Sequence, residues 1–156
     1  MKTNDKTIAI LNDLIKINND RVEGYEKAIK DAAGDANLLP IFSEYAGQSR
    51  SFSNELRRMI IDMGGTPTDG TTVAGKIYRV WMDLKSAVSA SEQVSALDLS
   101  EYGEDAAQKA YKEALGEATG MAADILGIII TQKSALKRAH DTIKGLRDRQ
   151  HAMEQH

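Results

Sequence analysis

Residues 94–115 read VSALDLSEYGEDAAQKAYKEAL, and this stretch decides how the rest of the chain is interpreted. Its apolar residues recur at the spacing of an amphipathic helix. It also brings carboxylates and tyrosines, among them Glu104 and Tyr111, toward the face that a helical bundle would bury. The stretch therefore predicts a core helix that carries either a polar layer or a metal site.

The composition excludes several classes of protein. The 156 residues include no cysteine, so thiol catalysis and cysteine-based zinc or iron–sulfur sites are excluded. A net charge of −3 with interspersed signs gives no basic surface for nucleic acid. No apolar run approaches the roughly 20 residues that a bilayer-spanning helix needs, and the N-terminus has no signal-peptide core. We expect a cytoplasmic domain with no nucleic-acid or membrane partner.

Two long helices are predicted before residue 64. The core positions of the first follow one three-then-four spacing: Ile8, Leu11, Ile15, Asn18, Val22, Tyr25, Ile29 and Ala32. The second has a similar stripe from Leu38 to Met63, which Tyr45 and Ser49 interrupt. Gly34 is expected to end the first helix and Asp35 to cap the second, whose start near Ala36 or Leu39 stays open because of Pro40. Gly64 and Gly65 are expected to end it.

A long connection is predicted next. Residues 66–72 form a loop and residues 73–90 a short amphipathic helix that contains Trp81, giving enough chain to cross the length of a bundle. Ser89 with Glu92 has the form of a capping box for the third long helix. The predicted fold is all-α: a ferritin-like four-helix bundle with a long crossover that contains an additional short helix between the second and third long helices. Residues 1–148 form one domain, and residues 149–156 are expected to be a frayed tail.

The middle of the predicted bundle is polar. Counting from the turns places Asn18 opposite residues 49–55 and Glu104 opposite residues 132–136. A di-metal carboxylate site needs a Glu-x-x-His on two of its helices, and neither the second nor the fourth helix has one. We therefore predict no metal, cofactor or catalytic residue, and a buried polar layer made of Asn18, Tyr25, Tyr45, Glu104, Tyr111 and Gln132. The alternative is a metal-binding or ferroxidase-like protein with a non-standard site around Glu101 and Glu104, with His140 as a further ligand.

Five groups of residues together resemble a known family. They are residues 11–15 and 24–25, Phe42 with residues 44–46, residues 81–85, residues 103–106 with Tyr111, and residues 139–141 with 146–148. On these the chain, over about residues 8–148, is similar to a bacterial family of ferritin-like four-helix bundles catalogued as a domain of unknown function. The resemblance implies the ferritin-like bundle and brings no activity, substrate or ligand set.

Ferritins themselves offer a wider comparison. They carry a Tyr seven residues after the metal-binding Glu of the first helix; Tyr25 is similarly placed, but Asn18 stands where that Glu would be. Glu104 resembles the third-helix Glu, and Gln132 lies near the start of the fourth-helix ligands. The pattern resembles a ferritin scaffold that has lost its metal site. We expect a non-catalytic, stress-associated or interaction protein that self-associates. Trp81 either pins the crossover helix to the bundle or, with Ile77 and Tyr78, forms the contact of a homodimer.

Overall fold

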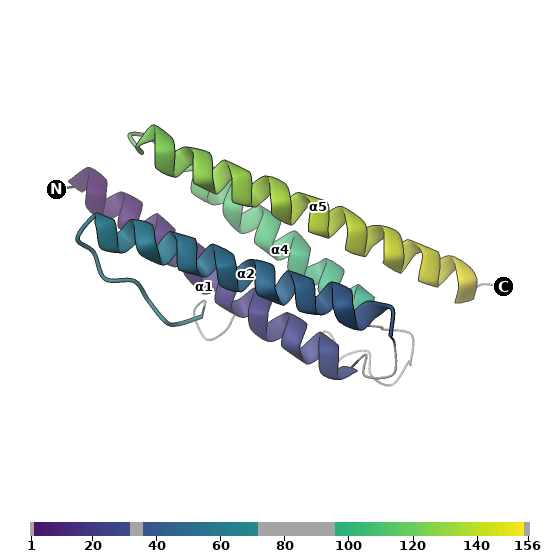
Figure 1. Cartoon of the computed structure of the whole chain (residues 1–156). Helices are drawn as coiled ribbons and strands as arrows, with labels where there is room; N and C mark the ends of the chain where they lie inside the picture. The colour runs from purple at the N-terminus through teal and green to yellow at the C-terminus, as the bar shows by residue number, and fades with distance from the viewer. Residues whose placement is uncertain (1, 32–35, 72–95, 155–156) are drawn as a thin grey trace.

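The computed structural model describes residues 2–31, 36–71 and 96–154, and within these ranges it is all-helical with no strand. Its four helices are α1 (Lys2–Asp31), α2 (Leu38–Asp62), α4 (Ala96–Gly116) and α5 (Ala123–Glu154) (Figure 1). The predicted crossover helix at 73–90, with Trp81, and the capping box at Ser89 lie outside the described residues. Over the described ranges, the prediction of an all-α fold with four long helices is confirmed.

The directions of the helices follow from their side-chain pairs. In α1, Asn18 contacts Ser49 of α2 and Tyr111 of α4, while Arg21 contacts Tyr45 and Glu104, so α1 runs antiparallel to both neighbours. Figure 1 shows α2 and α4 running the same way and α5 running back beside α4. The chain between Asp62 and Ala96 therefore connects opposite ends of the molecule.

The end of α2 is set by the two glycines that the sequence indicated. Gly64 adopts a left-handed φ of 79°, its N–H donates to the Ile61 carbonyl (2.9 Å), and the N–H of Gly65 donates to that of Ile60 (2.9 Å). These two bonds make a Schellman motif, which satisfies carbonyls that the helix end would otherwise leave free. The prediction that α2 stops here is confirmed.

The segment after α2 folds back along α1. Asn12 donates to the Thr66 carbonyl (3.2 Å) and accepts from the Thr68 N–H (2.9 Å), and Asn19 donates to the Gly70 carbonyl (2.7 Å). Asn12 and Asn19 lie two turns apart on α1, so the loop begins to travel along the helix axis as soon as α2 ends.

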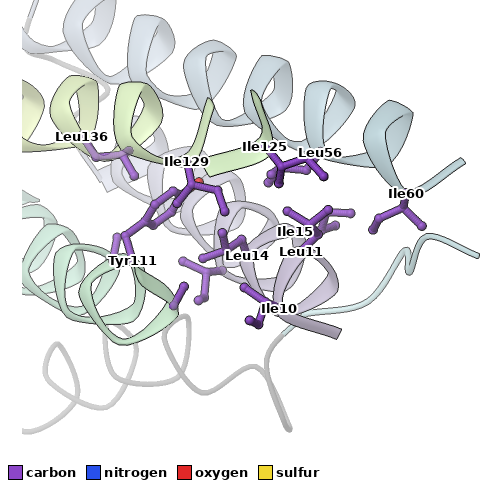
Figure 2. Packing of buried hydrophobic residues seen from close by; sticks show 13 residues of the cluster. Ile10, Leu11, Leu14, Ile15, Leu56, Ile60, Tyr111, Ile125, Ile129 and Leu136 are labelled. Atoms are coloured by element: carbon purple, nitrogen blue, oxygen red, sulfur yellow. The ribbon is translucent and has the colours of Figure 1, made fainter. Parts of the chain in front are cut away.

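Apolar packing is divided into two clusters with polar side chains between them. One cluster contains the apolar residues of α1 between Ile10 and Ile17, with Leu56, Tyr111 and Ile129 from the other three helices (Figure 2). The other lies further along α1 and is centred on Tyr25 and Phe42. Between them, α1 buries the polar residues 18, 20 and 21.

Among the described residues, no helix combines the length and the apolar composition that crossing a membrane would need.

Two boundaries differ from the predictions. The N-cap of α2 is Asn37, while Gly34 and Asp35 lie outside the described residues; Pro40 lies in the first turn of α2, where a proline is tolerated. Helix α5 continues to Glu154 through most of the segment expected to be a frayed tail. There His151 Nε2 lies 2.9 Å from Asp98 Oδ1 of α4, a polar contact that an apolar pattern does not reveal.

Candidate functional site

A buried ion pair lies at the centre of the polar layer. Arg21 of α1 donates to Glu104 of α4 through Nε (to Oε1, 2.5 Å) and Nη2 (to Oε2, 3.0 Å), and each side chain is 1% exposed. Two parallel bonds between a guanidinium and a carboxylate are the strongest geometry for such a pair. Burial alone would lower the pKa of Arg21, but the charge and hydrogen bond of Glu104, together with the nearby Tyr25 and Tyr111, outweigh burial and raise the pKa, so Arg21 stays charged.

A directed chain of hydrogen bonds leaves this ion pair and crosses all four helices. Arg21 Nη1 donates to Ser49 Oγ (2.8 Å), which donates to Asn18 Oδ1 (2.9 Å). Asn18 Nδ2 donates to the Tyr111 hydroxyl (2.8 Å), which donates to Gln132 Oε1 (2.7 Å). The last bond runs from Gln132 Nε2 to Glu55 Oε1 at the surface (2.8 Å).

The chain has only one consistent direction. It begins at a guanidinium, which can only donate, and ends at a carboxylate, which accepts when ionised. Each group between them accepts once and donates onward, and Asn18 also donates to the Leu14 carbonyl (2.9 Å). The orientations of both side-chain amides are thereby fixed. The layer specifies the register of the four helices, because a one-residue shift of any helix would break several bonds at once.

Tyrosines enclose the guanidinium. The Cζ of Arg21 lies 5.2 Å from the ring centroid of Tyr25 and 5.5 Å from that of Tyr45, within the range of cation–π attraction. Burial, and for Tyr25 also the charge of Glu104, raises the pKa of the Tyr25 and Tyr111 hydroxyls, so both stay neutral. The hydroxyl of Tyr111 can therefore act as a donor in the chain at any ordinary pH.

The six residues of the predicted polar layer are all buried, but their pairing differs from the prediction. Asn18, Tyr111 and Gln132 form one connected run, and Asn18 contacts Ser49 of α2 as the count from the first turn suggested. Glu104 does not pair with Gln132 or Asn18; it pairs with Arg21, which the sequence reasoning missed.

The spacing of Arg21 in the sequence indicates a buried position, but its charge suggests a position at the surface. Arg21 follows Ile17 by four residues and precedes Tyr25 by four, so it lies on the buried face of α1. A stripe defined only by apolar and neutral polar residues excludes an arginine. Arginine together with the lone carboxylate Glu104 opposite would have indicated an internal ion pair.

The prediction that Glu104 lies opposite residues 132–136 is wrong by one to two turns. Next to Glu104 in the chain, Asp105 Oδ1 lies 2.5 Å from His140 Nε2, and Glu101 Oε2 forms an ion pair with Arg147 Nη1 (3.0 Å). Long side chains and a six-residue connection between Gly116 and Ala123 make the midpoint of a turn a poor guide to register several turns away.

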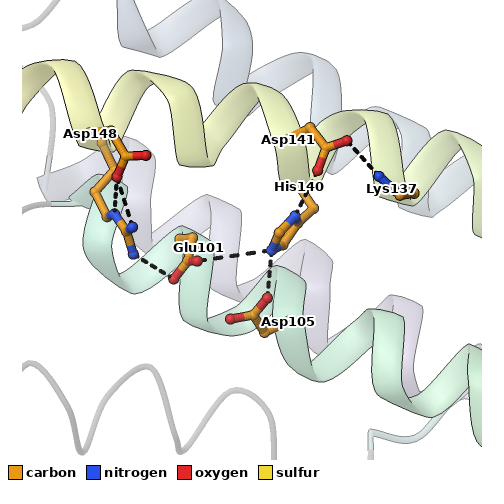
Figure 3. A network of polar contacts seen from close by, with 7 residues as sticks. Glu101, Asp105, Lys137, His140, Asp141 and Asp148 are labelled. Atoms are coloured by element: carbon orange, nitrogen blue, oxygen red, sulfur yellow. Dashed lines mark hydrogen bonds and ion pairs between the residues drawn. The ribbon is translucent and has the colours of Figure 1, made fainter.

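The carboxylates of the alternative hypothesis separate into two networks. Glu104 lies inside the bundle with Arg21, whereas Glu101 lies at the α4–α5 surface with Asp105 and His140 (Figure 3). The nearest carboxylate and imidazole atoms of these three residues all lie within 4.8 Å of one another. The pair Glu101 and Glu104 therefore does not form one site.

The interior residues do not fit a di-metal centre of the ferritin kind. Glu104 already has both oxygens bonded to Arg21, and Asn18 and Gln132 offer neutral amides where such a centre uses carboxylates and imidazoles. A cation entering this layer would also meet the buried positive charge of Arg21. The chemistry that the layer supports is hydrogen bonding and charge neutralisation within the protein.

One protein family matches the sequence. It is described as "Domain of unknown function (DUF2383)", and the match covers residues 6–117, which include α2 and α4 in full up to Gly116 and most of α1. Among curated proteins, nothing matches the chain significantly. The match thus includes Asn18, Arg21, Ser49, Glu104 and Tyr111, and leaves out Gln132 on α5.

Proposed function

Since the chain belongs to the DUF2383 family, whose description assigns no activity, we propose from its interior that it is a non-catalytic ferritin-like bundle that acts through protein interactions. The observation that carries the proposal is the ion pair of Arg21 and Glu104. A guanidinium supplies internally the positive charge that a metal would supply at the midpoint of a ferritin-like bundle. The layer then serves to fix helix register, at some cost in stability.

The course of the chain supports the ferritin-like part of the proposal. Helices α2 and α4 run the same way, so one long connection must join them along the molecule, as in ferritin-like bundles and unlike a simple up-down-up-down bundle. The loop that leaves Gly65 and follows α1 from Asn12 to Asn19 starts such a connection.

In this proposal the protein is bacterial and cytoplasmic, has a stress-associated or interaction role, and self-associates. The region of Trp81, which lies outside the described residues, is the proposed contact between two copies. Solution sizing of the wild type and of Trp81→Ala tests this part. A dimer that becomes monomeric in the variant is expected, and an identical size for both proteins would contradict it.

Metal analysis tests the non-catalytic interior. The wild type and Glu104→Gln, each purified without added metal or chelator, are expected to carry the same amounts of iron and manganese. The reason is that Glu104 bonds Arg21 and is not a ligand. Stoichiometric iron or manganese in the wild type that Glu104→Gln loses would overturn the proposal in favour of a metal-binding or ferroxidase-like protein.

A further inference from the structure

His140 is oriented like a metal ligand at the surface between α4 and α5. Its Nδ1 lies 3.1 Å from Asp141 Oδ1, while its Nε2 points to the facing helix, 2.5 Å from Asp105 Oδ1 and 3.9 Å from Glu101 Oε1 (Figure 3). An imidazole that donates one N–H to a carboxylate presents its other nitrogen as a basic, fixed ligand. Glu101 and Asp105, four residues apart, lie on the same face of α4.

Two of the carboxylates around His140 are held by residues outside the cluster. Glu101 Oε2 forms an ion pair with Arg147 Nη1 (3.0 Å), which leaves Oε1 facing His140. Asp141 Oδ2 accepts from Lys137 (2.8 Å), which keeps its Oδ1 on the imidazole. Glu101 and His140 are therefore oriented by partners behind them, as metal ligands commonly are.

The charges around the cluster favour a divalent ion. Glu101, Asp105, Asp141 and Asp148 contribute four negative charges, and Lys137 and Arg147 contribute two positive ones, so with a neutral imidazole the sum is −2. A divalent cation would neutralise it. Asp105 is 58% exposed, which gives an ion direct access from solvent.

We propose that Glu101, Asp105 and His140 bind one divalent transition-metal ion of the Zn²⁺ class, which links α4 to α5. Imidazole nitrogen and carboxylate oxygen are both ligand types that zinc accepts, and three such ligands leave a fourth, open position, whereas Mg²⁺ and Ca²⁺ favour oxygen ligands alone. Zinc–ligand bonds of about 2.0–2.2 Å place tetrahedral ligand atoms roughly 3.4 Å apart. The 2.5 Å and 3.9 Å contacts of His140 bracket that separation.

This site is separate from the proposed function. It uses none of the side chains of the polar layer, and the ion would join two helices at the surface. Loss of this site would leave the proposal for Arg21 and Glu104 intact, and Glu104→Gln is expected to leave Zn²⁺ binding unchanged.

Calorimetric titration with Zn²⁺ on the untagged, metal-stripped full chain tests the site. We expect one ion per chain in the wild type and an affinity at least about tenfold lower in His140→Gln and in Asp105→Asn. Asp141→Asn should lower the affinity by about 10- to 100-fold, because it removes the negative charge behind the imidazole and changes none of the three ligands. Asp105→Asn alters a mostly exposed side chain, so the test does not depend on the folding of the histidine variant.

The matched control is His151→Gln. His151 also lies on α5 and also faces a carboxylate of α4, but it has one such partner, Asp98 at 2.9 Å, in place of a cluster. The affinity of the His151→Gln protein for Zn²⁺ should stay within about twofold of that of the wild type. If His151→Gln lowers the affinity for Zn²⁺ as much as His140→Gln does, the ion is bound by the C-terminal histidines and the proposed site is overturned. The site would also be overturned if the wild type does not bind Zn²⁺ with a Kd below about 1 mM. The same holds if His140→Gln and Asp105→Asn both bind Zn²⁺ as tightly as the wild type.

Discussion

Replacing Glu104 with glutamine should destabilise the protein far more than the same change at the surface. The variant keeps the shape of the side chain but leaves the charge of Arg21 buried without a counter-charge, and the amide nitrogen can no longer accept one of the two guanidinium bonds. Removing one partner of a buried ion pair costs about 3–5 kcal/mol. For a domain of this size that loss lowers Tm by roughly 6–20 °C.

The chain contains a matched control for this experiment. Glu26 and Arg50 also approach to 2.5 Å, but their side chains are 52% and 53% exposed. Glu26→Gln should therefore change the unfolding free energy by no more than about 1 kcal/mol. Urea denaturation followed by circular dichroism measures both variants. Equal effects for Glu26→Gln and Glu104→Gln, or a loss below about 1 kcal/mol for Glu104→Gln, would refute the burial of the pair.

A double variant distinguishes the interaction between Arg21 and Glu104 from the separate contribution of each side chain. Arg21→Met with Glu104→Leu removes both charges and fills a similar volume, so its unfolding free energy should lie closer to the wild type than that of either single variant. Part of the loss will remain, because Ser49 Oγ and the Tyr45 carbonyl lose the donor that Arg21 provides. A double variant as unstable as the sum of the two single variants would contradict a direct interaction.

Three further predictions follow from other parts of the structure. Asn18→Leu should lower the unfolding free energy by about 1–3 kcal/mol, because the Ser49 hydroxyl loses its acceptor inside the bundle. An unchanged midpoint of urea denaturation would contradict the hydrogen-bond chain. Gly65→Ala should destabilise the protein by about 1–3 kcal/mol, because a Cβ there would lie 2.8 Å from Ile8 Cδ1. Gly127→Ala should instead stabilise it by about 0.5–1 kcal/mol, because Gly127 lies within α5, in its second turn, and a Cβ there would meet nothing within 4 Å. The reverse order of stability in thermal melts would be incompatible with this packing. In metal-free buffer His140 should titrate by NMR above the usual pKa of about 6.5. Burial opposes this shift, but it is outweighed by the hydrogen bonds that the imidazolium donates to Asp141 and Asp105 and by the charges of Asp105 and Glu101. The contribution of His140 to stability is then complete below about pH 6.5 and is lost as the pH rises through the folded-state pKa, and a folded-state pKa below 6.5 would contradict these contacts.

The helices and the polar character of the core could be predicted from spacing alone. The three-then-four pattern placed Asn18 and Tyr25 on the buried face of α1, and Gly64 and Gly65 ended α2 where the pattern stopped. These features depend on local rules that each helix obeys separately. For the same reason the position of Asn18 opposite Ser49, across a short turn, could be counted.

Features that depend on several helices at once were missed. Arg21 is buried only because Glu104, Ser49 and Tyr45 from two other helices surround it, and a single-helix pattern assigns such a residue to the surface. The surface cluster was missed in part, because Asp105 joins Glu101 and His140 only in the register that α4 and α5 adopt. The extent of α5 likewise depends on contacts such as His151 with Asp98.

The charged guanidinium at the centre of the bundle can be observed directly through the Nε–H group of Arg21 by ¹H–¹⁵N NMR, assigned by its absence in Arg21→Lys. The account predicts a resolved Nε–H signal that exchanges slowly with solvent, is unchanged by a chelator, and shifts in Glu104→Gln but not in Glu26→Gln. A signal that exchanges as fast as that of the exposed Arg50, or that moves when iron or manganese is removed, would contradict it.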